Sequence, residues 1–428
     1  MLADGLMADS RLTKKPDHQT EQVNKNTNKM NRRNFLRNTG FVAAGSLFVP
    51  AFMKPLEAMA LDELSLYKNL IVVQLSGGND GLNTVIPFGN DIYYQKRNSI
   101  AIKPESIIKL NDMQGLNPNM AALQEIYDQG WMTIINDVGY PNPDRSHFRS
   151  MDIWQTGSDS NQFLSTGWIG RYLDSNCQTC KFPYTAIEVD DSLSLAMKGQ
   201  TKKGIALKDP AALFRNTNDP FFKAMLQNDK EHLDEDNLGY LYKTMIETSS
   251  SASYIQNTSK VYQSKFTYPN SGFANQLKTV SKFISSGLKT RVYYVSLSGF
   301  DTHVNQIGQQ GNLLKQYSEG IAAFLKDLKS NNKLEDTLVI TFSEFGRRVE
   351  QNASNGTDHG TANNMFVFGG RLKKQGIFNA APNLSDLDTG DLKYQLDFRQ
   401  VYGTILDKWL DVNNADILNK KFNTLDFI

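Results

Sequence analysis

Residues 69–81 read NLIVVQLSGGNDG, an unbroken apolar run that ends in a glycine-rich loop. A continuous run of this kind is typical of a strand buried on both faces of a parallel sheet. Similar apolar runs occur at 131–136, 292–297, 337–342 and 365–368. Helical patterns occur at 118–129, 146–156, about 311–329 and 397–410. Strands alternating with helices predict an α/β fold, with a mostly parallel sheet flanked by helices.

The composition narrows the classes of partner. Forty per cent of the 428 residues are hydrophobic, which is enough for a sizeable core. The formal net charge is +1 and charges of both signs are interspersed, so we expect no nucleic-acid partner. No later segment has 18 consecutive apolar residues, so we expect no transmembrane segment after signal cleavage. Residues 61–428 are expected to form one α/β domain, with a polar helical insertion at about 210–290.

Residues 30–60 carry the three parts of an export signal in order. Arg32 and Arg33 precede an apolar stretch at 40–52, and Ala58-Met59-Ala60 offers a small-x-small cleavage site. Paired arginines predict a twin-arginine signal peptide, a periplasmic or secreted protein, and the twin-arginine export machinery as a partner. An N-terminal membrane anchor or a buried helix is the alternative. Residues 1–29 are polar and predict a disordered tail, unless translation begins at Met30.

The only cysteines, Cys177 and Cys180, form a C-x-x-C pair. In an oxidising compartment they are expected to form a small disulfide or to remain an idle pair. A redox or metal-binding role is the alternative, although one C-x-x-C supplies too few ligands for a four-cysteine zinc site.

Polar side chains follow the predicted strands. They are Asp80, Asp301, His303 and Glu344, and His359 lies just before the run at 365–368. Because the carboxyl ends of parallel strands meet at one sheet edge, these side chains are expected to converge in one cleft. Carboxylates and imidazoles held together are ligands for a divalent metal, with Mg²⁺, Ca²⁺, Mn²⁺ and Zn²⁺ left open. His147 lies in a neighbouring segment and adds to the histidines in these loops.

Each residue also has a simpler interpretation. Asp80 precedes Gly81 and is typical of a turn, and Asp301 is typical of a residue that caps a following turn. Glu344 has Arg347 and Arg348 nearby as ion-pair partners, and His359 suits a hydrogen-bonded loop.

The same loops resemble those of the alkaline phosphatase superfamily, which includes sulfatases and cofactor-independent phosphoglycerate mutases. The similar elements are Asp80-Gly81, the helix from Arg145-Ser146-His147-Phe148 to Thr156-Gly157, Asp301-Thr302-His303, Ser343-Glu344-Phe345-Gly346 and His359. More narrowly, the chain resembles the twin-arginine-exported family known as domain of unknown function 1501. The motifs behind this are 75–83, 144–148, 300–303, 342–347 and 358–360.

The resemblance implies a site and its roles. One metal site would use Asp301, His303 and His359, and a second, oxygen-rich site would use Asp80 and Glu344. Ser146 would attack the ester, with a helix N-cap as its alternative role. Arg145 or Arg347 would hold the anionic oxygens, with a surface ion pair as the alternative.

The sequence also departs from the superfamily pattern. Phe345 replaces a histidine, Asp301 and His303 are two residues apart rather than four, and Pro141 stands at the nucleophile position of the sulfatase motif. From the motifs, the expected function is an exported metal-dependent hydrolase of phosphate or sulfate esters, with a small anionic ester as substrate. The alternative is a non-catalytic binding or cell-surface protein with a degenerate metal site and a surface glycan as partner.

Overall fold

The computed structural model describes residues 67–176, 183–227 and 237–428. The expected tail at 1–29, the expected signal peptide at 30–60 and both cysteines, Cys177 and Cys180, lie outside the described residues. Within the described ranges, no helix is long and apolar enough to cross a membrane.

A nine-stranded sheet forms the centre of the described chain, in the order β11-β5-β10-β9-β1-β8-β6-β7, with β14 beside β5. Its long strands are β1 (Asn69–Ser76), β5 (Met132–Gly139), β8 (Val292–Ser298), β9 (Thr337–Phe342) and β10 (Asn363–Gly369). Its short strands are β6 (Ala186–Glu188), β7 (Ile205–Ala206), β11 (Gly376–Ile377) and β14 (Leu396–Asp397). All five predicted apolar runs are strands of this sheet.

The strand β1 shows why its apolar run is unbroken. It pairs in parallel with β8 on one side and β9 on the other, with Leu70 opposite Val292 and Leu338. Its alternate side chains enter opposite cores: Ile71 and Val73 face one, and Leu70 and Val72 the other. Because successive side chains point to opposite faces, a strand covered on both sides must be apolar at every position.

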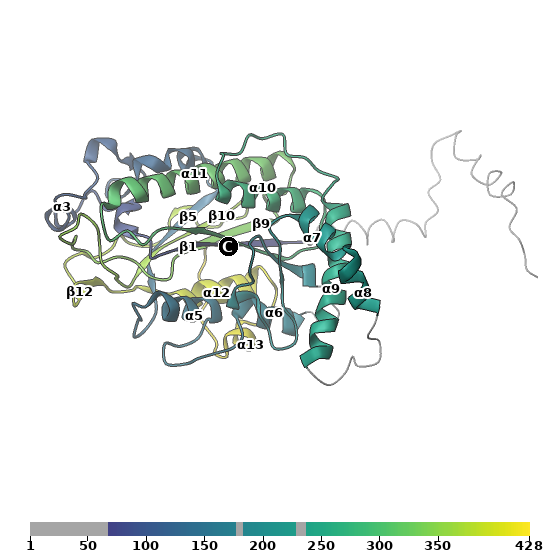
Figure 1. Ribbon diagram of the computed structural model, residues 1–428. Helices are drawn as coiled ribbons and strands as arrows, with labels where there is room; N and C mark the ends of the chain where they lie inside the picture. Colours follow the sequence, from purple (N-terminus) through teal and green to yellow (C-terminus); the bar gives the residue numbers. More distant parts are fainter. Residues whose placement is uncertain (1–66, 177–182, 228–236) are drawn as a thin grey trace, which may run out of the picture. The chain divides into compact units, whose positions relative to one another are not determined.

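Helices cover both faces of the sheet (Figure 1). One face carries the 3₁₀ helix η3 (Pro118–Leu123), α4 (Gln124–Asp128), α10 (Gly272–Ser285) and α11 (Gln306–Ser330). The other carries α5 (His147–Thr156), α6 (Trp168–Asn176), α12 (Phe398–Lys408) and α13 (Asn414–Leu418). The predicted α/β architecture, a mostly parallel sheet flanked by helices, is therefore confirmed.

The strand β10 is the exception to parallel pairing, because it runs antiparallel to both β5 and β9. Its first residue, Asn363, therefore lies at the edge where β1, β5, β8 and β9 end. The loop that precedes β10, with His359, is brought to the carboxyl edge by this reversal.

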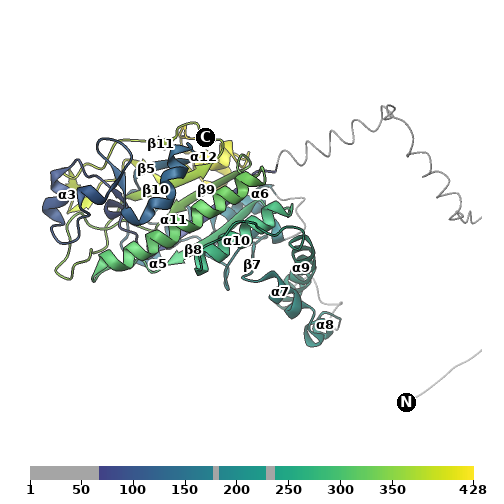
Figure 2. The ribbon, with the colours of Figure 1, turned by 90° about the horizontal axis from the view of Figure 1, so that it is seen from above.

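The described residues of the polar segment at about 210–290 are mainly helical. It contains α7 (Pro210–Thr217), α8 (Pro220–Gln227), α9 (Asn237–Thr258) and α10. The first three lie together beyond β7, whereas α10 lies alongside α11 over the sheet (Figure 2). Phe273 and Leu277 of α10 are buried in the core of that layer, so α10 belongs to the main helical layer.

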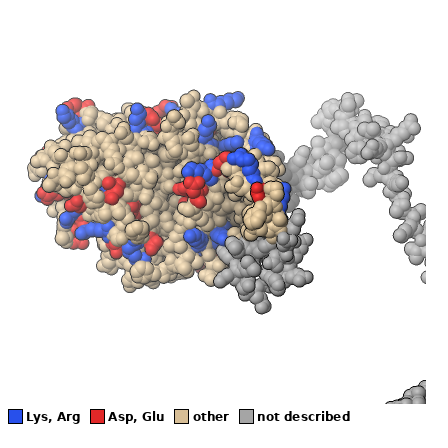
Figure 3. All heavy atoms as spheres, viewed as in Figure 1, with Lys and Arg blue, Asp and Glu red and all other residues tan. Residues whose placement is uncertain are grey.

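The remaining elements are short. They are α3 (Asp91–Lys96), η1 (Gly81–Asn83), η2 (Pro104–Ser106), η4 (Pro183–Thr185), η5 (Leu195–Met197), and strands β2 (Val85–Ile86), β3 (Ile108–Lys109), β4 (Gly115–Leu116), β12 (Leu387–Asp388) and β13 (Asp391–Leu392). On the face seen in Figure 3, acidic and basic side chains are interspersed among uncharged ones.

Candidate metal centre

Three histidines and one aspartate meet at the carboxyl edge of the sheet. His147 begins α5 after β5, Asp301 and His303 follow β8, and His359 precedes β10. The Asp301 Oδ1 atom lies 3.0 Å from His303 Nε2, 3.3 Å from His359 Nε2 and 3.5 Å from His147 Nε2. Ligand atoms of His147, Asp301 and His359 all lie within 4.8 Å of one another. The predicted convergence of Asp301, His303 and His359 is therefore present, and His147 joins them.

The other ring nitrogen of each histidine faces an acceptor oxygen, which fixes the ring. The Nδ1 acceptors are Glu344 Oε1 for His147 at 2.9 Å, the Arg145 backbone oxygen for His359 at 2.8 Å and Asp358 Oδ1 for His303 at 3.4 Å. An oxygen acceptor at Nδ1 assigns the proton of a neutral imidazole to that nitrogen and leaves a lone pair on Nε2.

The lone pairs of these Nε2 atoms then lie close together. His303 Nε2 and His359 Nε2 are 2.9 Å apart, a separation at which two lone pairs repel unless a proton or a cation lies nearby. His147 Nε2 is buried and has no hydrogen-bond partner within the described residues. A buried acceptor without a donor is costly, and a cation at the centre of the three rings would satisfy this arrangement.

The pKa shifts favour the deprotonated, metal-binding form of Asp301 and His359 and oppose it at His147. Burial raises the pKa of Asp301, but the Arg347 guanidinium, His359 and His303 together lower it to about 2. Burial also lowers the pKa of His359 against the opposing effect of the Arg145 carbonyl. The hydrogen bond to Glu344 raises the pKa of His147.

Arg347 forms an ion pair with Asp301 and holds its carboxylate in place. Its side chain is buried, and its NH2 group donates to Asp301 Oδ1 at 2.7 Å. The guanidinium also donates to backbone oxygens of Gly77, Gly78, Phe300 and Thr357, and its NH1 group lies 3.4 Å from His303 Nε2. With its donors directed at these oxygens, Arg347 is placed as a positioning residue rather than as the anion holder that the resemblance implied.

Gly77 lets the β1 loop approach the β8 loop. Its φ is +119°, and a Cβ there would lie 2.5 Å from the Asp301 backbone nitrogen. Its own N–H donates to Glu344 Oε1 at 2.8 Å. The glycine at the end of the first strand thus permits the packing that brings Asp301 and Glu344 together.

Asp80 is placed differently from what we expected. Its Oδ2 atom lies 2.5 Å from NH1 of Arg97, whose side chain is fully buried. Gln306 Nε2 is also 2.5 Å away, and the Leu82 and Asn83 N–H groups donate to Oδ1. Asp80 therefore caps a turn, as in its simpler interpretation, and a guanidinium balances its charge.

Glu344 supports a histidine instead of forming the expected second metal site with Asp80. Its buried carboxylate accepts from Gly77 N–H and Ser343 Oγ as well as facing His147 Nδ1. A carboxylate behind a metal-ligating histidine fixes the ring and raises its basicity. Phe345 packs its ring 4.9 Å from His147 and 4.6 Å from His359, so it forms an apolar wall of the centre.

Ser146 and Arg145 lie directly before His147. Ser146 occupies the N-cap position of α5, but its side chain makes no capping hydrogen bond. Ser146 is exposed, and within the described residues its hydroxyl has no hydrogen-bond partner. Arg145 forms an ion pair with buried Asp391.

Two important residues were not assigned from the sequence. His147 was noted among the loop histidines, and its position directly after an expected nucleophile was a usable signal. Arg97 lies 17 residues beyond Asp80 in a segment without a motif, so nothing local indicated its role.

Solved structures similar to the chain include three distant ones. The PsFucS1 sulfatase from Pseudoalteromonas sp. is 11% identical, with 87% of this chain and 72% of that chain covered and a TM-score of 0.40. The lipoteichoic acid synthase LtaP from Listeria monocytogenes is 10% identical, with 73% and 67% covered and a TM-score of 0.34. A protein in the alkaline phosphatase superfamily from Vibrio parahaemolyticus is 10% identical, with 71% and 60% covered and a TM-score of 0.31.

No curated protein matches the sequence. A family model does match, and its span of residues 136–417 covers α5, β8, β9 and β10 together with all four residues of the cluster around Asp301. The match extends over more than half of the chain and includes four of the five motifs behind the narrower resemblance, while the motif at 75–83 lies before it. The chain therefore belongs to the family described as protein of unknown function (DUF1501).

Proposed function

We propose that the chain is a metal-dependent hydrolase of phosphate or sulfate esters. The observation that carries the proposal is the arrangement of the three imidazoles, each fixed through Nδ1 with its Nε2 directed at Asp301 Oδ1. Preorganised histidines with outer hydrogen bonds are characteristic of metal ligands. The superfamily resemblance of the loop motifs agrees with this chemistry.

The donor set fits a zinc-like ion. Three imidazole nitrogens and one carboxylate oxygen suit Zn²⁺ better than Mg²⁺ or Ca²⁺, which prefer oxygen ligands. His147, Asp301, His303 and His359 would hold the ion. When bound, a divalent ion would stabilise negative charge on the ester oxygens and lower the pKa of the attacking group.

The start of α5 supplies the groups that would act on the ester. The Ser146 hydroxyl is free to attack, because no capping bond holds it. The first N–H groups of α5 have no acceptor within the helix and carry the positive end of its dipole. They would hold the anionic ester oxygens, the role that the resemblance gave to Arg145 or Arg347.

Turnover of 4-nitrophenyl phosphate and 4-nitrophenyl sulfate by zinc-loaded protein tests the proposal. We expect hydrolysis of one of them to fall by at least about a hundredfold in Ser146→Ala and in His359→Ala. Ser106→Ala, an exposed serine in η2, is the matched control and should retain full activity. If the zinc-loaded wild type hydrolyses neither ester, the proposal is overturned.

A non-catalytic binding protein is the second candidate, and one observation favours it. The ligand atoms of His147, Asp301 and His359 lie within 4.8 Å of one another. If His303 joined them, four donors would complete a tetrahedral zinc site, whereas catalytic zinc sites usually keep one position open. His303 decides between the two, since its Nε2 lies 3.4 Å from an Arg347 donor as well as near the cluster. A metal centre without turnover in which His303→Ala loses the ion would favour the binding protein.

We also propose that Arg32 and Arg33 direct export by the twin-arginine route, with cleavage after Ala60. Replacing both by Lys should retain the precursor in the cytoplasm, while exported wild-type protein should begin at Leu61. An exported protein whose N-terminal sequence still includes residues 31–60 would contradict this.

A further inference from the structure

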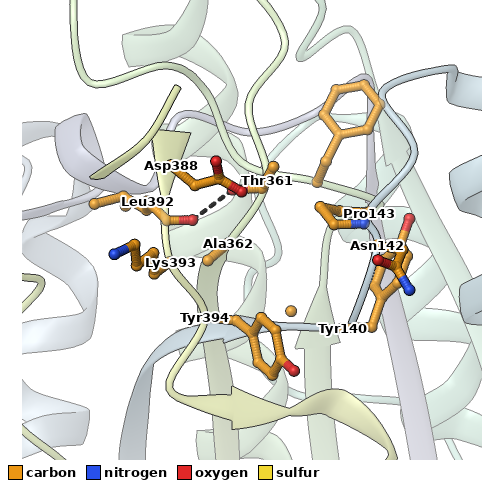
Figure 4. A pocket seen from close by; sticks show the side chains of 11 residues that line it. Tyr140, Asn142, Pro143, Thr361, Ala362, Asp388, Leu392, Lys393 and Tyr394 are labelled. Carbon is orange, nitrogen blue, oxygen red and sulfur yellow. Dashed lines mark hydrogen bonds between the residues drawn. The ribbon is translucent and has the colours of Figure 1, made fainter. Parts of the chain in front are cut away.

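A cavity of about 410 Å³ is lined by eleven residues (Figure 4). Phe345 lines it, and the same ring packs against His147 and His359. Asn142 also lines it and is followed five residues later by His147. Thr361 lines it two residues after His359. The cavity and the cluster around Asp301 are therefore built from the same loops, and the Phe345 ring is their common wall.

The inner walls of the cavity are apolar. Tyr140, Phe345, Ala362 and Leu392 line it and are almost fully buried in the fold. Figure 4 shows Tyr140 and Pro143 on one side, with Asp388 and Lys393 across the space. A cavity with an aromatic side and a polar side suits a ring that is apolar on its faces and polar at its edge.

The rim is polar but offers no surplus positive charge. Asn142, Asp388, Lys393 and Tyr394 line it and are exposed. Lys393 is already ion-paired with Asp386. Within the described part of the chain, the Asn142 amide and the Tyr394 hydroxyl make no hydrogen bond. The rim therefore has free hydrogen-bonding groups for hydroxyls, and no free cation for a second anionic group.

We propose that this cavity binds a neutral sugar ring, the part of the substrate that carries the ester; in this form the inference rests on the proposed hydrolase function. The C–H face of the sugar would lie against the aromatic wall, and its hydroxyls would bond to Asn142, Asp388 and Tyr394. A purely apolar aryl group would make none of these hydrogen bonds and would therefore gain less from the rim.

Saturation-transfer NMR tests binding directly and does not require turnover. The probes are the methyl glycosides of glucose, galactose, mannose and fucose, with 4-nitrophenol as the aryl comparison. We expect at least one glycoside to receive saturation from the wild-type protein, before and after metal removal with a chelator. If the zinc-loaded wild type hydrolyses neither ester but still binds a glycoside, the hydrolase proposal is wrong and the sugar site remains supported.

Two variants test whether the saturation transfer arises from binding in the cavity. Tyr394→Ala should weaken glycoside binding by about tenfold, the loss expected for one hydrogen bond from the rim. Phe221→Ala, an exposed aromatic on α8, should leave binding unchanged. The proposal is overturned if no glycoside binds the wild type, if Tyr394→Ala binds as well as the wild type, or if only 4-nitrophenol binds.

Discussion

Asp80 and Asp301 occupy equivalent positions, each in a loop after a central strand, and differ in what surrounds them. Asp80 meets a fully buried guanidinium, and both of its oxygens have donors. Asp301 also pairs with a buried guanidinium, that of Arg347, but in addition it meets three imidazole Nε2 atoms, one of which has no hydrogen-bond partner in the described structure. A strand-end carboxylate is thus not sufficient to indicate a metal site. What matters is whether acceptor atoms around it remain unsatisfied.

The largest expected effect is on the Asp80 side. Arg97→Met would leave a buried carboxylate without its cation, which typically costs about 3–5 kcal/mol of the free energy of unfolding. Urea unfolding measures it. Arg215→Met is the matched control, because Arg215 is exposed and its ion pair with Asp209 is 3.9 Å long. That control should change stability by less than about 1 kcal/mol, and equal losses in both variants would break the comparison.

On the Asp301 side, stability should depend on metal. A bound ion stabilises the fold by about 2.7 kcal/mol at a hundredfold excess over its dissociation constant. The wild type should therefore lose melting temperature on chelation, and His359→Ala should show no such loss because a ligand is missing. Thermal melts with and without chelator measure this. An identical chelator response in both proteins would remove His359 from the ligand set.

Glu344 sharpens the comparison, since it acts on the centre through His147. Glu344→Gln keeps the shape but removes the charge that supports the imidazole, so zinc affinity should fall by about 10–100-fold. A competitive zinc titration measures the change. Glu350→Gln, an exposed glutamate paired with Lys96, is the control and should bind zinc like the wild type. Unchanged affinity in Glu344→Gln would remove its supporting role.

Asp137 is a third buried carboxylate, and within the described residues it has only Gln395 as a side-chain donor. Burial raises its pKa to about 7, so the folded state keeps a proton that the unfolded chain releases near pH 4. Stability should therefore fall as pH rises from about 4 to 7, by at most about 1.4 kcal/mol per pH unit. Asp137→Asn should lack this contribution in urea unfolding across that range, and parallel pH profiles would contradict the assignment.

The local patterns of the sequence were sufficient for the five long strands and for the helices that follow them, but not for the short strands β6, β7, β11 and β14 or for α6 and α13. Every predicted strand is present, because a strand buried on both faces must be apolar along its length. The direction of β10 was not predictable, since an apolar run carries no information about its orientation. That reversal is what brings His359 to the carboxyl edge.

The candidate site was predicted only in part for a similar reason. Asp301, His303 and His359 follow from their positions next to strands. The partners of Asp80 do not, because Arg97 is brought to it by loop packing that no local spacing encodes. His147 depends on the pairing of β5 with β10, which places the start of α5 opposite the β8 loop.

Native mass spectrometry of the purified protein titrated with Zn²⁺ tests the central claim most directly. The geometry of the cluster predicts one ion per chain in the wild type, none retained in His359→Ala under the same conditions, and one retained in Glu350→Gln. No bound ion in the wild type, or equal zinc binding in the wild type and His359→Ala, would contradict the metal centre around Asp301.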